Sequence, residues 1–326
     1  MPDRAAWYKS ARLAAGAFLF LAVLSGCASV VPQTMALRDT WPQGVALRTE
    51  IGGVPFFPQE QYQCGPAALA TTLVHAGAQV TPEELVRLVY VPARRGSLQI
   101  EMLAASRRYG RVSYPLAPYF DDLLREVAAG NPVIVLQDNG IGPITNWHYA
   151  VVIGFDYPAG ELYLRSGETK RLAIPFTVFE YTWKKSNYWA MLTMPPGRIP
   201  VTAMESDYLA AISAMERADG ARAAISAYST FLERWPDNLA ASIGLANQHY
   251  VLGALKDAEA VLRRAAARHP DSVAVLNNLA QTLSDLGRNY EALALIERAQ
   301  RKNESPFSAA VQDTYALILK RMGGNK

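Results

Sequence analysis

The second half of the chain repeats itself every 34 residues, and this periodicity constrains its fold more than any other feature. Pro236 and Pro270 are 34 residues apart, and the same offset relates residues of matching type at further positions. A repeat of this length is typical of a helix–turn–helix unit that buries its apolar side by stacking on the next unit. We therefore predict an all-α array over residues 203–326, with a more degenerate copy from about residue 203 and a closing helix from about 306 to 322. The other matching pairs are Leu245 and Leu279, Leu252 and Leu286, Gly253 and Gly287, Ala258 and Ala292, and Leu262 and Ile296.

Residues 51–197 have a different pattern, in which predicted helices come first and predicted strands follow. Helices are expected at 65–77, from Thr81 with the spacing of a capping box to Glu84, at 99–109 and at 119–129. A short strand or edge segment is expected at 54–57. Strands are expected at 133–136, 149–153 and 162–164, with a hairpin turn over 156–160. This order indicates an α+β domain, which ends at the prolines near residue 197.

The first 26 residues are predicted as a signal peptide. Basic residues at 4, 9 and 12 precede an apolar stretch over 13–24, which is too short to span a bilayer comfortably. The stretch ends in Leu-Ser-Gly before Cys27, which resembles a bacterial lipobox, where the cysteine is acylated on sulfur and becomes the new N-terminus. The resemblance implies a cell-envelope lipoprotein, anchored in the membrane by the lipid on Cys27, with residues 27–50 as a tether. Ala28 and Ser29 follow the cysteine, and no aspartate stands beside it. This resembles the sorting signal for the outer membrane, and it implies a protein that is anchored there and faces the periplasm. The alternative is a soluble secreted protein with an ordinary cleavage site.

The chain has two cysteines, so a lipid on Cys27 leaves Cys64 without an intramolecular disulfide partner. An unpaired thiol in an oxidising compartment is a chemical liability. Keeping such a thiol suggests that its reactivity is used.

Cys64 directly precedes a predicted helix, which is a position that favours a thiolate. The positive end of a helix and a nearby imidazolium both lower a cysteine pKa, and the thiolate is the form that attacks a carbonyl. An upstream glutamine side chain can donate to the oxyanion that forms, beside the backbone N–H of the cysteine. Gln59 is our candidate for that donor, and Gln61 and Gln63 are its alternatives.

Four histidines could serve as the base for Cys64. His249 and His269 lie in the repeats, and His75 lies three turns along the helix that follows Cys64. His148 opens a strong predicted strand, which can hold an imidazole rigidly against the helix N-terminus. We therefore predict Cys64 as the nucleophile and His148 as the base.

The Cys64-Gly65-Pro66 and Trp147-His148-Tyr149 motifs, with the segments around them, resemble the double-glycine peptidase family that processes bacteriocin leaders, a branch of the papain-like fold. The 34-residue array resembles the tetratricopeptide repeat family. The first resemblance implies a papain-like cysteine peptidase domain that cleaves peptide bonds, with Cys64 and His148 as catalytic residues. The second implies a concave surface that binds a protein or peptide partner. The family spacing of the upstream glutamine falls on Pro58 here, so Gln59 matches it less directly.

The acid of such a family is an aspartate on the strand after the histidine strand, and here that place holds Ser166. Folding the hairpin about residues 158 and 159 brings Ser166 and Glu168 back beside His148, on one face of the sheet. Either side chain could orient the imidazole. Asp156 lies eight extended residues from His148, about 26 Å away, and is predicted as a turn residue.

The composition and the residue spacing do not favour a protein that binds nucleic acid, a metal or a cofactor. The 32 basic and 29 acidic side chains are scattered, without a basic run interleaved with aromatics, so a nucleic-acid partner is not expected. No histidine, cysteine and aspartate cluster has metal-ligand spacing, so neither a metal nor a cofactor is expected. The predicted function is an envelope endopeptidase whose repeats recruit its protein substrate. Two alternatives remain: a papain-like amidase or acyltransferase, and a degenerate domain that binds a peptide without cutting it.

Overall fold

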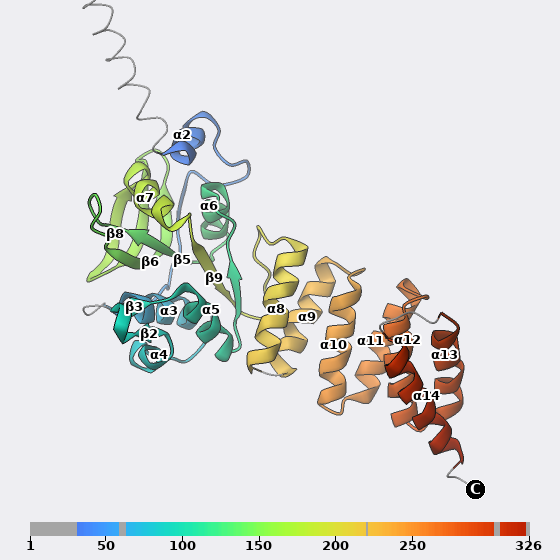
Figure 1. Cartoon of the computed structure of the whole chain (residues 1–326). Helices are drawn as coiled ribbons and strands as arrows, with labels where there is room; N and C mark the ends of the chain where they lie inside the picture. Colours follow the sequence, from blue (N-terminus) through green and yellow to red (C-terminus); the bar gives the residue numbers. More distant parts are fainter. Residues whose placement is uncertain (1–30, 59–62, 220, 303–306, 324–326) are drawn as a thin grey trace, which may run out of the picture. The chain divides into compact units, whose positions relative to one another are not determined.

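The computed structural model describes residues 31–58, 63–219, 221–302 and 307–323. The predicted signal peptide, Cys27, Gln59 and Gln61 lie outside these ranges. The chain divides into two compact units (Figure 1). The first combines residues up to Met102 with Pro115–Leu192, and the second combines Leu103–Tyr114 with Thr193–Lys326.

A sheet with the strand order β4-β9-β5-β6-β7-β8 organises the α+β part of the chain, and β1 also pairs with β6. The ladders of β6 with β1, β5 and β7, and of β7 with β8, are antiparallel. Every residue of β5 is buried, which explains why this strand reads as a continuous apolar run. The strands are β1 (Arg48–Glu50), β4 (Val112–Pro115), β5 (Val133–Asp138), β6 (Trp147–Asp156), β7 (Glu161–Ser166), β8 (Thr169–Pro175) and β9 (Ala190–Met194).

The predicted strands at 133–136, 149–153 and 162–164 lie inside β5, β6 and β7. The strand predicted at 54–57 is absent, because Pro55 interrupts the N–H donors that a ladder needs. A side chain holds this segment instead: Arg165 Nη2 donates to the Val54 carbonyl at 2.9 Å.

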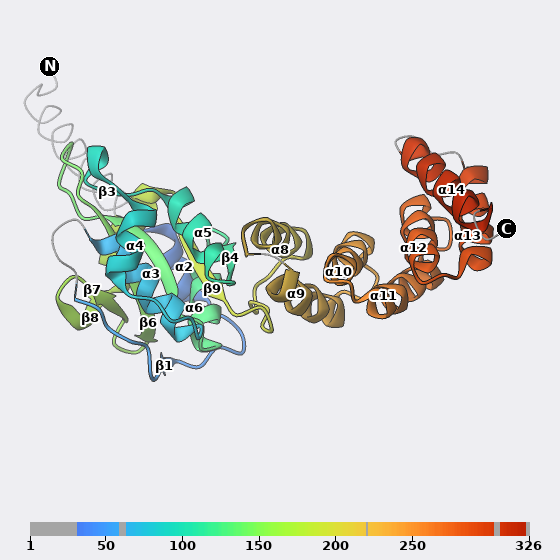
Figure 2. The same ribbon diagram turned by 90° about the horizontal axis from the view of Figure 1, so that it is seen from below.

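Helices cover both faces of the sheet. α3 (Cys64–His75) and α4 (Pro82–Val89) lie opposite α2 (Pro32–Asp39), α6 (Phe120–Ala128) and α7 (Phe176–Trp183) (Figures 1 and 2). α3 and α6 confirm two predicted helices, and α5 (Gln99–Arg108) confirms a third. The Phe120 ring packs against Phe176, Phe179 and Trp183, which joins α6 to α7.

The predicted capping box is present at the start of α4. The Thr81 N–H donates to Glu84 Oε2 at 2.9 Å, and the Glu84 N–H donates to Thr81 Oγ1 at 3.4 Å. After α4, a short ribbon of β2 (Tyr90–Val91) and β3 (Gly96–Ser97) encloses the 3-10 turn η1 (Pro92–Arg94). A second 3-10 turn, η2 (Lys184–Ser186), follows α7.

The tether prediction is wrong for residues 31–50, which are folded. The Glu180 carboxylate accepts from the N–H groups of Gln33 at 2.9 Å and Thr34 at 2.6 Å, and so satisfies the N-terminus of α2. Farther along, the Trp41 ring lies 4.3 Å from the Tyr157 ring, centroid to centroid, and β1 then joins β6. The hydrogen-bond partners of Gln33, Thr34 and Gln43 lie 82 to 147 residues away in the sequence, so the pattern of the segment itself does not predict the packing.

The second unit contains a helical array, as the 34-residue period predicted. The N-cap residues Asn238 and Ser272 share the same backbone angles, φ −72° and ψ 109°, and both caps accept a hydrogen bond from three residues on. Gly253 and Gly287 both have positive φ, 72° and 80°, at the turns inside the repeats. The helices are α8 (Glu205–Asp219), α9 (Ala221–Arg234), α10 (Leu239–Val251), α11 (Leu255–Arg268), α12 (Val273–Asp285), α13 (Asn289–Lys302) and the closing α14 (Ser308–Gly323).

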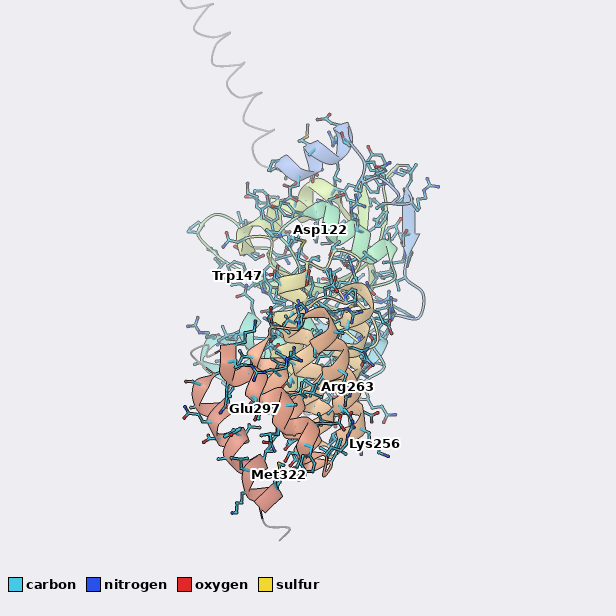
Figure 3. All side chains as sticks on the ribbon, turned by 90° about the vertical axis from the view of Figure 1, so that its right-hand side faces the viewer. Asp122, Trp147, Lys256, Arg263, Glu297 and Met322 are labelled. Carbon is cyan, nitrogen blue, oxygen red and sulfur yellow. The ribbon has the colours of Figure 1, made fainter. Side chains whose placement is uncertain are left out.

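Ion pairs connect α11 with the start of α13 in the next repeat. Arg263, labelled in Figure 3, contacts Glu259 on its own helix at 2.7 Å and Glu291 on α13 at 3.1 Å. Arg288 contacts Glu259 at 2.6 Å. These side chains are substantially exposed except for Glu259, so packing rather than charge supplies most of the stability of the array.

Candidate active site

A cavity of about 920 Å³ in the first unit contains the two residues predicted to be catalytic. Its described lining includes Cys64 at the start of α3 and His148 near the start of β6. Trp147, labelled in Figure 3, also lines it and is 47% exposed. The cavity is therefore open to solvent beside the candidate nucleophile and base.

Cys64 is the first residue of α3 and is half-buried. Burial raises the pKa of its thiol, while hydrogen bonds from the backbone of Tyr149, Gly65 and Cys64 itself lower it in part. The contact with Tyr149 places the sulfur against the beginning of β6, beside the residue that follows His148. The helix N-terminus and the histidine strand therefore meet at the thiol.

Ser166, which stands where the family resemblance predicts an acid, contacts His148. Its Nε2 lies 2.8 Å from Ser166 Oγ. Arg165 pairs with Val151, so Ser166 lies diagonally across from His148 on the neighbouring strand. With Nε2 engaged by Ser166, Nδ1 is the other ring nitrogen. Burial lowers the pKa of His148, so the neutral imidazole is favoured.

Two segments of the chain match known protein families. Residues 51–191 match the Peptidase_C39 like family, and residues 203–274 and 252–318 match the tetratricopeptide repeat. The chain carries a C39-like peptidase domain followed by tetratricopeptide repeats.

Solved structures of both classes match parts of the chain. A C39-like peptidase from Bacillus anthracis is 16% identical, with a TM-score of 0.40, over 45% of this chain and 97% of that one. The peptidase domain of Streptococcus ComA, a bifunctional ABC transporter in quorum sensing, is 20% identical, with a TM-score of 0.35, over 43% and 98%. The TPR2B domain of yeast Sti1 in complex with pHsp70 is 18% identical, with a TM-score of 0.29, over 30% and 82%. No curated protein matches the chain.

Neither of the other candidate acids of the C39-like domain, Glu168 and Asp156, makes a hydrogen bond or ion pair with His148 in the described ranges, whereas Ser166 does. Glu168 is exposed in the turn between β7 and β8. Asp156 lies at the far end of β6, where it contacts Arg48 at 3.0 Å and accepts from the Ala159 N–H at 3.0 Å, as expected for a turn residue. Ser166 is thus the group that contacts the imidazole. A carboxylate can only accept a hydrogen bond at Nε2, whereas a hydroxyl accepts or donates, so Ser166 leaves both histidine tautomers available.

The upstream glutamine of the C39-like domain stays a prediction. Gln59 and Gln61 lie outside the described residues. Gln63 is the residue before α3, and its carbonyl accepts from the Ala67 N–H at 3.2 Å, while its side chain makes no capping hydrogen bond. The backbone of Cys64 at the helix N-terminus remains a described donor that an oxyanion could use.

Other residues that line the cavity, such as Ser97 and Tyr149, were not predicted from the sequence. Ser97 on β3 faces Gly65 so closely that a Cβ on Gly65 would lie 2.2 Å from Ser97 Oγ. The Tyr149 hydroxyl donates to the Ser97 carbonyl at 3.2 Å and so ties β3 to β6. Contacts of this kind join distant parts of the chain, and no local sequence pattern predicts them.

A buried carboxylate shapes the loop that leads into His148. Asp138, at the end of β5, accepts from the N–H groups of Gly140 at 2.9 Å and Asn146 at 2.7 Å. Lys185 lies 3.8 Å from the same carboxylate. Burial alone would raise the pKa of Asp138, but these hydrogen bonds and the Lys185 charge hold it below its usual value. Asp138 therefore stays ionised and closes the loop over residues 139–146.

Two further features of the described ranges concern metals and membranes. No group of three or more histidine, cysteine, aspartate or glutamate side chains there could hold a metal ion. None of the helices in those ranges combines the length and hydropathy needed to cross a bilayer.

Proposed function

We propose that the chain is a cysteine endopeptidase with Cys64 as nucleophile and His148 as base. The observation that carries this proposal is the position of the Cys64 sulfur, at the N-terminus of α3 and against the backbone of Tyr149, in the cavity that His148 also lines. The contact between His148 Nε2 and Ser166 supports it, because it occupies Nε2 and leaves Nδ1 as the ring nitrogen for the proton transfer.

The pKa directions favour proton transfer during attack over a preformed ion pair. Burial raises the pKa of Cys64 and lowers that of His148, so the resting pair is a thiol and a neutral imidazole. His148 Nδ1 takes the thiol proton as the sulfur attacks the peptide carbonyl, and backbone N–H groups at the start of α3 stabilise the oxyanion. The imidazolium then protonates the leaving amine. Water hydrolyses the thioester and restores the thiol.

A direct test compares the envelope proteins of the wild type with those of a Cys64→Ala strain. One protein should accumulate in an uncleaved form in the variant, and a His148→Ala strain should show the same precursor. A Cys64→Ala strain whose envelope peptides match the wild type at every terminus would reject the proposal.

We also propose that the chain is a lipoprotein anchored through Cys27 in the outer membrane, facing the periplasm, and that its repeats recruit the substrate or a partner. The basic start, the apolar run and the cysteine at its end support the anchor. A Cys27→Ala variant should move from the membrane fraction to the soluble fraction, or remain as an uncleaved precursor without lipid. Deleting residues 203–326 should reduce processing of a protein substrate more than cleavage of a short peptide.

A second candidate is a domain that binds a peptide without cutting it. Ser166 favours this candidate, since a hydroxyl adds no negative charge to stabilise an imidazolium. In that case Cys64→Ala would leave both processing and partner binding unchanged.

A further inference from the structure

The chain between the proposed anchor and the folded domain is short. Only three residues separate Cys27 from Val31, the first residue that the structure describes, and residues 31–50 already pack on the domain. Four residues of fully extended chain span at most about 14 Å. A lipid on Cys27 therefore places the start of α2, and the surface around it, close to the bilayer.

Exposed tyrosines flank the start of α2 on two sides. Gln33 Nε2 donates to the Pro118 carbonyl at 3.0 Å, and the next residue, Tyr119, is exposed. The Gln33 N–H donates to Glu180 Oε1 at 2.9 Å, and the next residue, Tyr181, is also exposed. Both rings thus lie at the place where the chain comes from the anchor.

The loop before β6 extends this surface. Lys185 Nζ lies 4.9 Å from the centroid of the Tyr181 ring and donates to the Gly140 carbonyl at 2.8 Å. The side chains of Ile141 and Ile144 in the same loop are 87% and 74% exposed. A Cβ on Gly140 would lie 1.8 Å from the Ile144 carbonyl oxygen, so the turn depends on a glycine. A closely packed turn therefore presents two isoleucines to the solvent.

Together these side chains form a surface that we call the apolar rim. Large apolar side chains that gather on a surface mark an interaction site. Tyrosines beside aliphatic side chains are typical of a surface that lies in the headgroup region of a bilayer. Two of the contributing helices, α2 and α7, lie at the same end of the first unit (Figure 1). The rim consists of Met35 on α2, Tyr119 before α6, Ile141 and Ile144 before β6, and Val178 and Tyr181 on α7.

The rim adjoins the cavity that contains the candidate catalytic residues. Glu180 Oε1, which accepts from the start of α2, also accepts from the Tyr188 hydroxyl at 3.3 Å, and the preceding residue, Asn187, lines the cavity. In the loop, Thr145 follows Ile144 and lines the cavity as well. A domain of this size is about 40 Å across. The cavity of a domain that rests on its rim therefore stays within that distance of the bilayer.

We propose that the apolar rim lies in the headgroup region of the bilayer that holds the lipid of Cys27. The cavity then acts on proteins attached to the same membrane, close to their point of attachment. About 40 Å corresponds to about 12 residues of extended chain, so cuts are expected within that span. The docking rests on the proposed anchor and needs no active thiol, whereas the cuts also rest on the proposed peptidase.

The docking is tested with the full acylated chain carrying Cys64→Ala, so that an engineered cysteine is the only thiol besides the acylated Cys27. Ile141→Cys, Tyr181→Cys and Arg87→Cys each receive the same fluorescent label. Arg87 is exposed on α4, across the sheet from α2 and α7, and is the matched control (Figures 1 and 2). The proteins are incorporated into vesicles of phosphatidylethanolamine and phosphatidylglycerol that contain lipids with a nitroxide quencher near the headgroup.

We expect the quencher to reduce the fluorescence at residues 141 and 181 but not at residue 87. Equal quenching at the three positions, or no quenching in protein that floats with the vesicles, would overturn the docking and leave the anchor standing. Protein that does not float with the vesicles would reject the anchor and the docking together.

The cuts are mapped in isolated envelope membranes from a strain that lacks this protein, after addition of the acylated wild type or the Cys64→Ala protein. Cuts that depend on Cys64 should lie within about 12 residues of a membrane-embedded or lipidated segment. The variant Ile141→Ser with Ile144→Ser and Tyr181→Ser changes only exposed side chains, so it should fold normally and spread the cuts away from the membrane. Ile100→Ser changes an exposed isoleucine outside the rim and should keep the wild-type cuts.

Cuts that are scattered along the substrates, or that do not change in the triple serine variant, would overturn the substrate assignment and leave the peptidase proposal standing. Absence of any cut that depends on Cys64 would reject the peptidase, while the quenching result would still decide whether the rim contacts the bilayer.

Discussion

Ser166 is the residue that most affects the chemistry of this site. A carboxylate beside His148 Nε2 would stabilise an imidazolium and, through it, a thiolate on Cys64. A hydroxyl at 2.8 Å holds the ring in place without adding charge. Cys64 and His148 therefore line one cavity, and the directions of their pKa shifts favour a neutral thiol and a neutral imidazole.

The pH dependence of Cys64 alkylation tests this description. Because burial raises the pKa of the thiol, less thiolate exists at a given pH than in free cysteine. Because burial lowers the pKa of His148, the neutral imidazole predominates near pH 7, so an imidazolium is not expected to produce an earlier transition. Iodoacetamide should therefore react with Cys64 in one transition, at higher pH than with free cysteine. A reactive plateau that begins below about pH 6 would show an ion pair instead.

The substitution Ser166→Asp should reverse both shifts. An aspartate next to Nε2 raises the pKa of His148, and the resulting imidazolium lowers that of Cys64. Alkylation at pH 7 should become about tenfold faster for each unit by which the thiol pKa falls. Ser166→Asn is the matched neutral control and should leave the rate close to that of the wild type. Equal rates in the Asp and Asn variants would mean that the imidazole does not control the thiol.

At the scale of elements, the approach of α3 to β3 depends on the absence of a side chain at residue 65. A Cβ on Gly65 would lie 2.2 Å from Ser97 Oγ and 2.6 Å from Ser97 Cβ. Gly65→Ala should therefore displace the ribbon or the helix and cost about 1–3 kcal/mol of unfolding free energy.

Two controls isolate that contact. The double variant Gly65→Ala with Ser97→Gly removes both clashing atoms and should recover most of the loss. Gly52→Ala introduces a Cβ with nothing within 4 Å and should change the midpoint of thermal unfolding little. If the double variant is no more stable than Gly65→Ala alone, the two residues are not coupled.

Glu180 joins α2 to the domain, and its replacement should release that helix. The carboxylate is fully buried and accepts from the N–H groups of Gln33 and Thr34. Glu180→Gln keeps the shape but replaces one acceptor oxygen by an amide donor, so about 2–3 kcal/mol of local stability should be lost. Hydrogen exchange of residues 32–39 should accelerate, whereas exchange in β5 should not. Unchanged protection of α2 would show that its apolar contacts suffice.

At the scale of the whole molecule, each of the two compact units combines two separate segments of the sequence. Leu103–Tyr114 belongs to the same unit as the repeats, although it is separated from them in sequence by most of the sheet. The Tyr208 ring on α8 lies 5.8 Å from Tyr114 and 6.4 Å from Phe231, centroid to centroid, and its hydroxyl donates to the Arg198 carbonyl at 2.8 Å. Tyr208 is fully buried.

Tyr208→Ala should therefore destabilise the second unit by about 3–5 kcal/mol, because it leaves a cavity between these groups. Tyr208→Phe keeps the ring contacts and should cost only about 1 kcal/mol for the lost hydrogen bond. Denaturant unfolding monitored by helical circular dichroism measures both. Equal losses in the two variants would assign the stability to the hydroxyl rather than to the ring.

Periodic and local signals carried the prediction of the helical array, the helix after Cys64 and the capping box at Thr81, and they left Ser166 and Glu168 as alternatives for the group at His148, of which Ser166 makes the contact. Each depends on residues that are neighbours in the sequence or are related by a short hairpin or a fixed repeat, so their spacing encodes their geometry. Glu180 capping α2 and Ser97 facing Gly65 depend on the tertiary structure alone. These contacts join residues far apart in the chain, and only the packing of the helices and ribbons on the sheet decides which side chains meet.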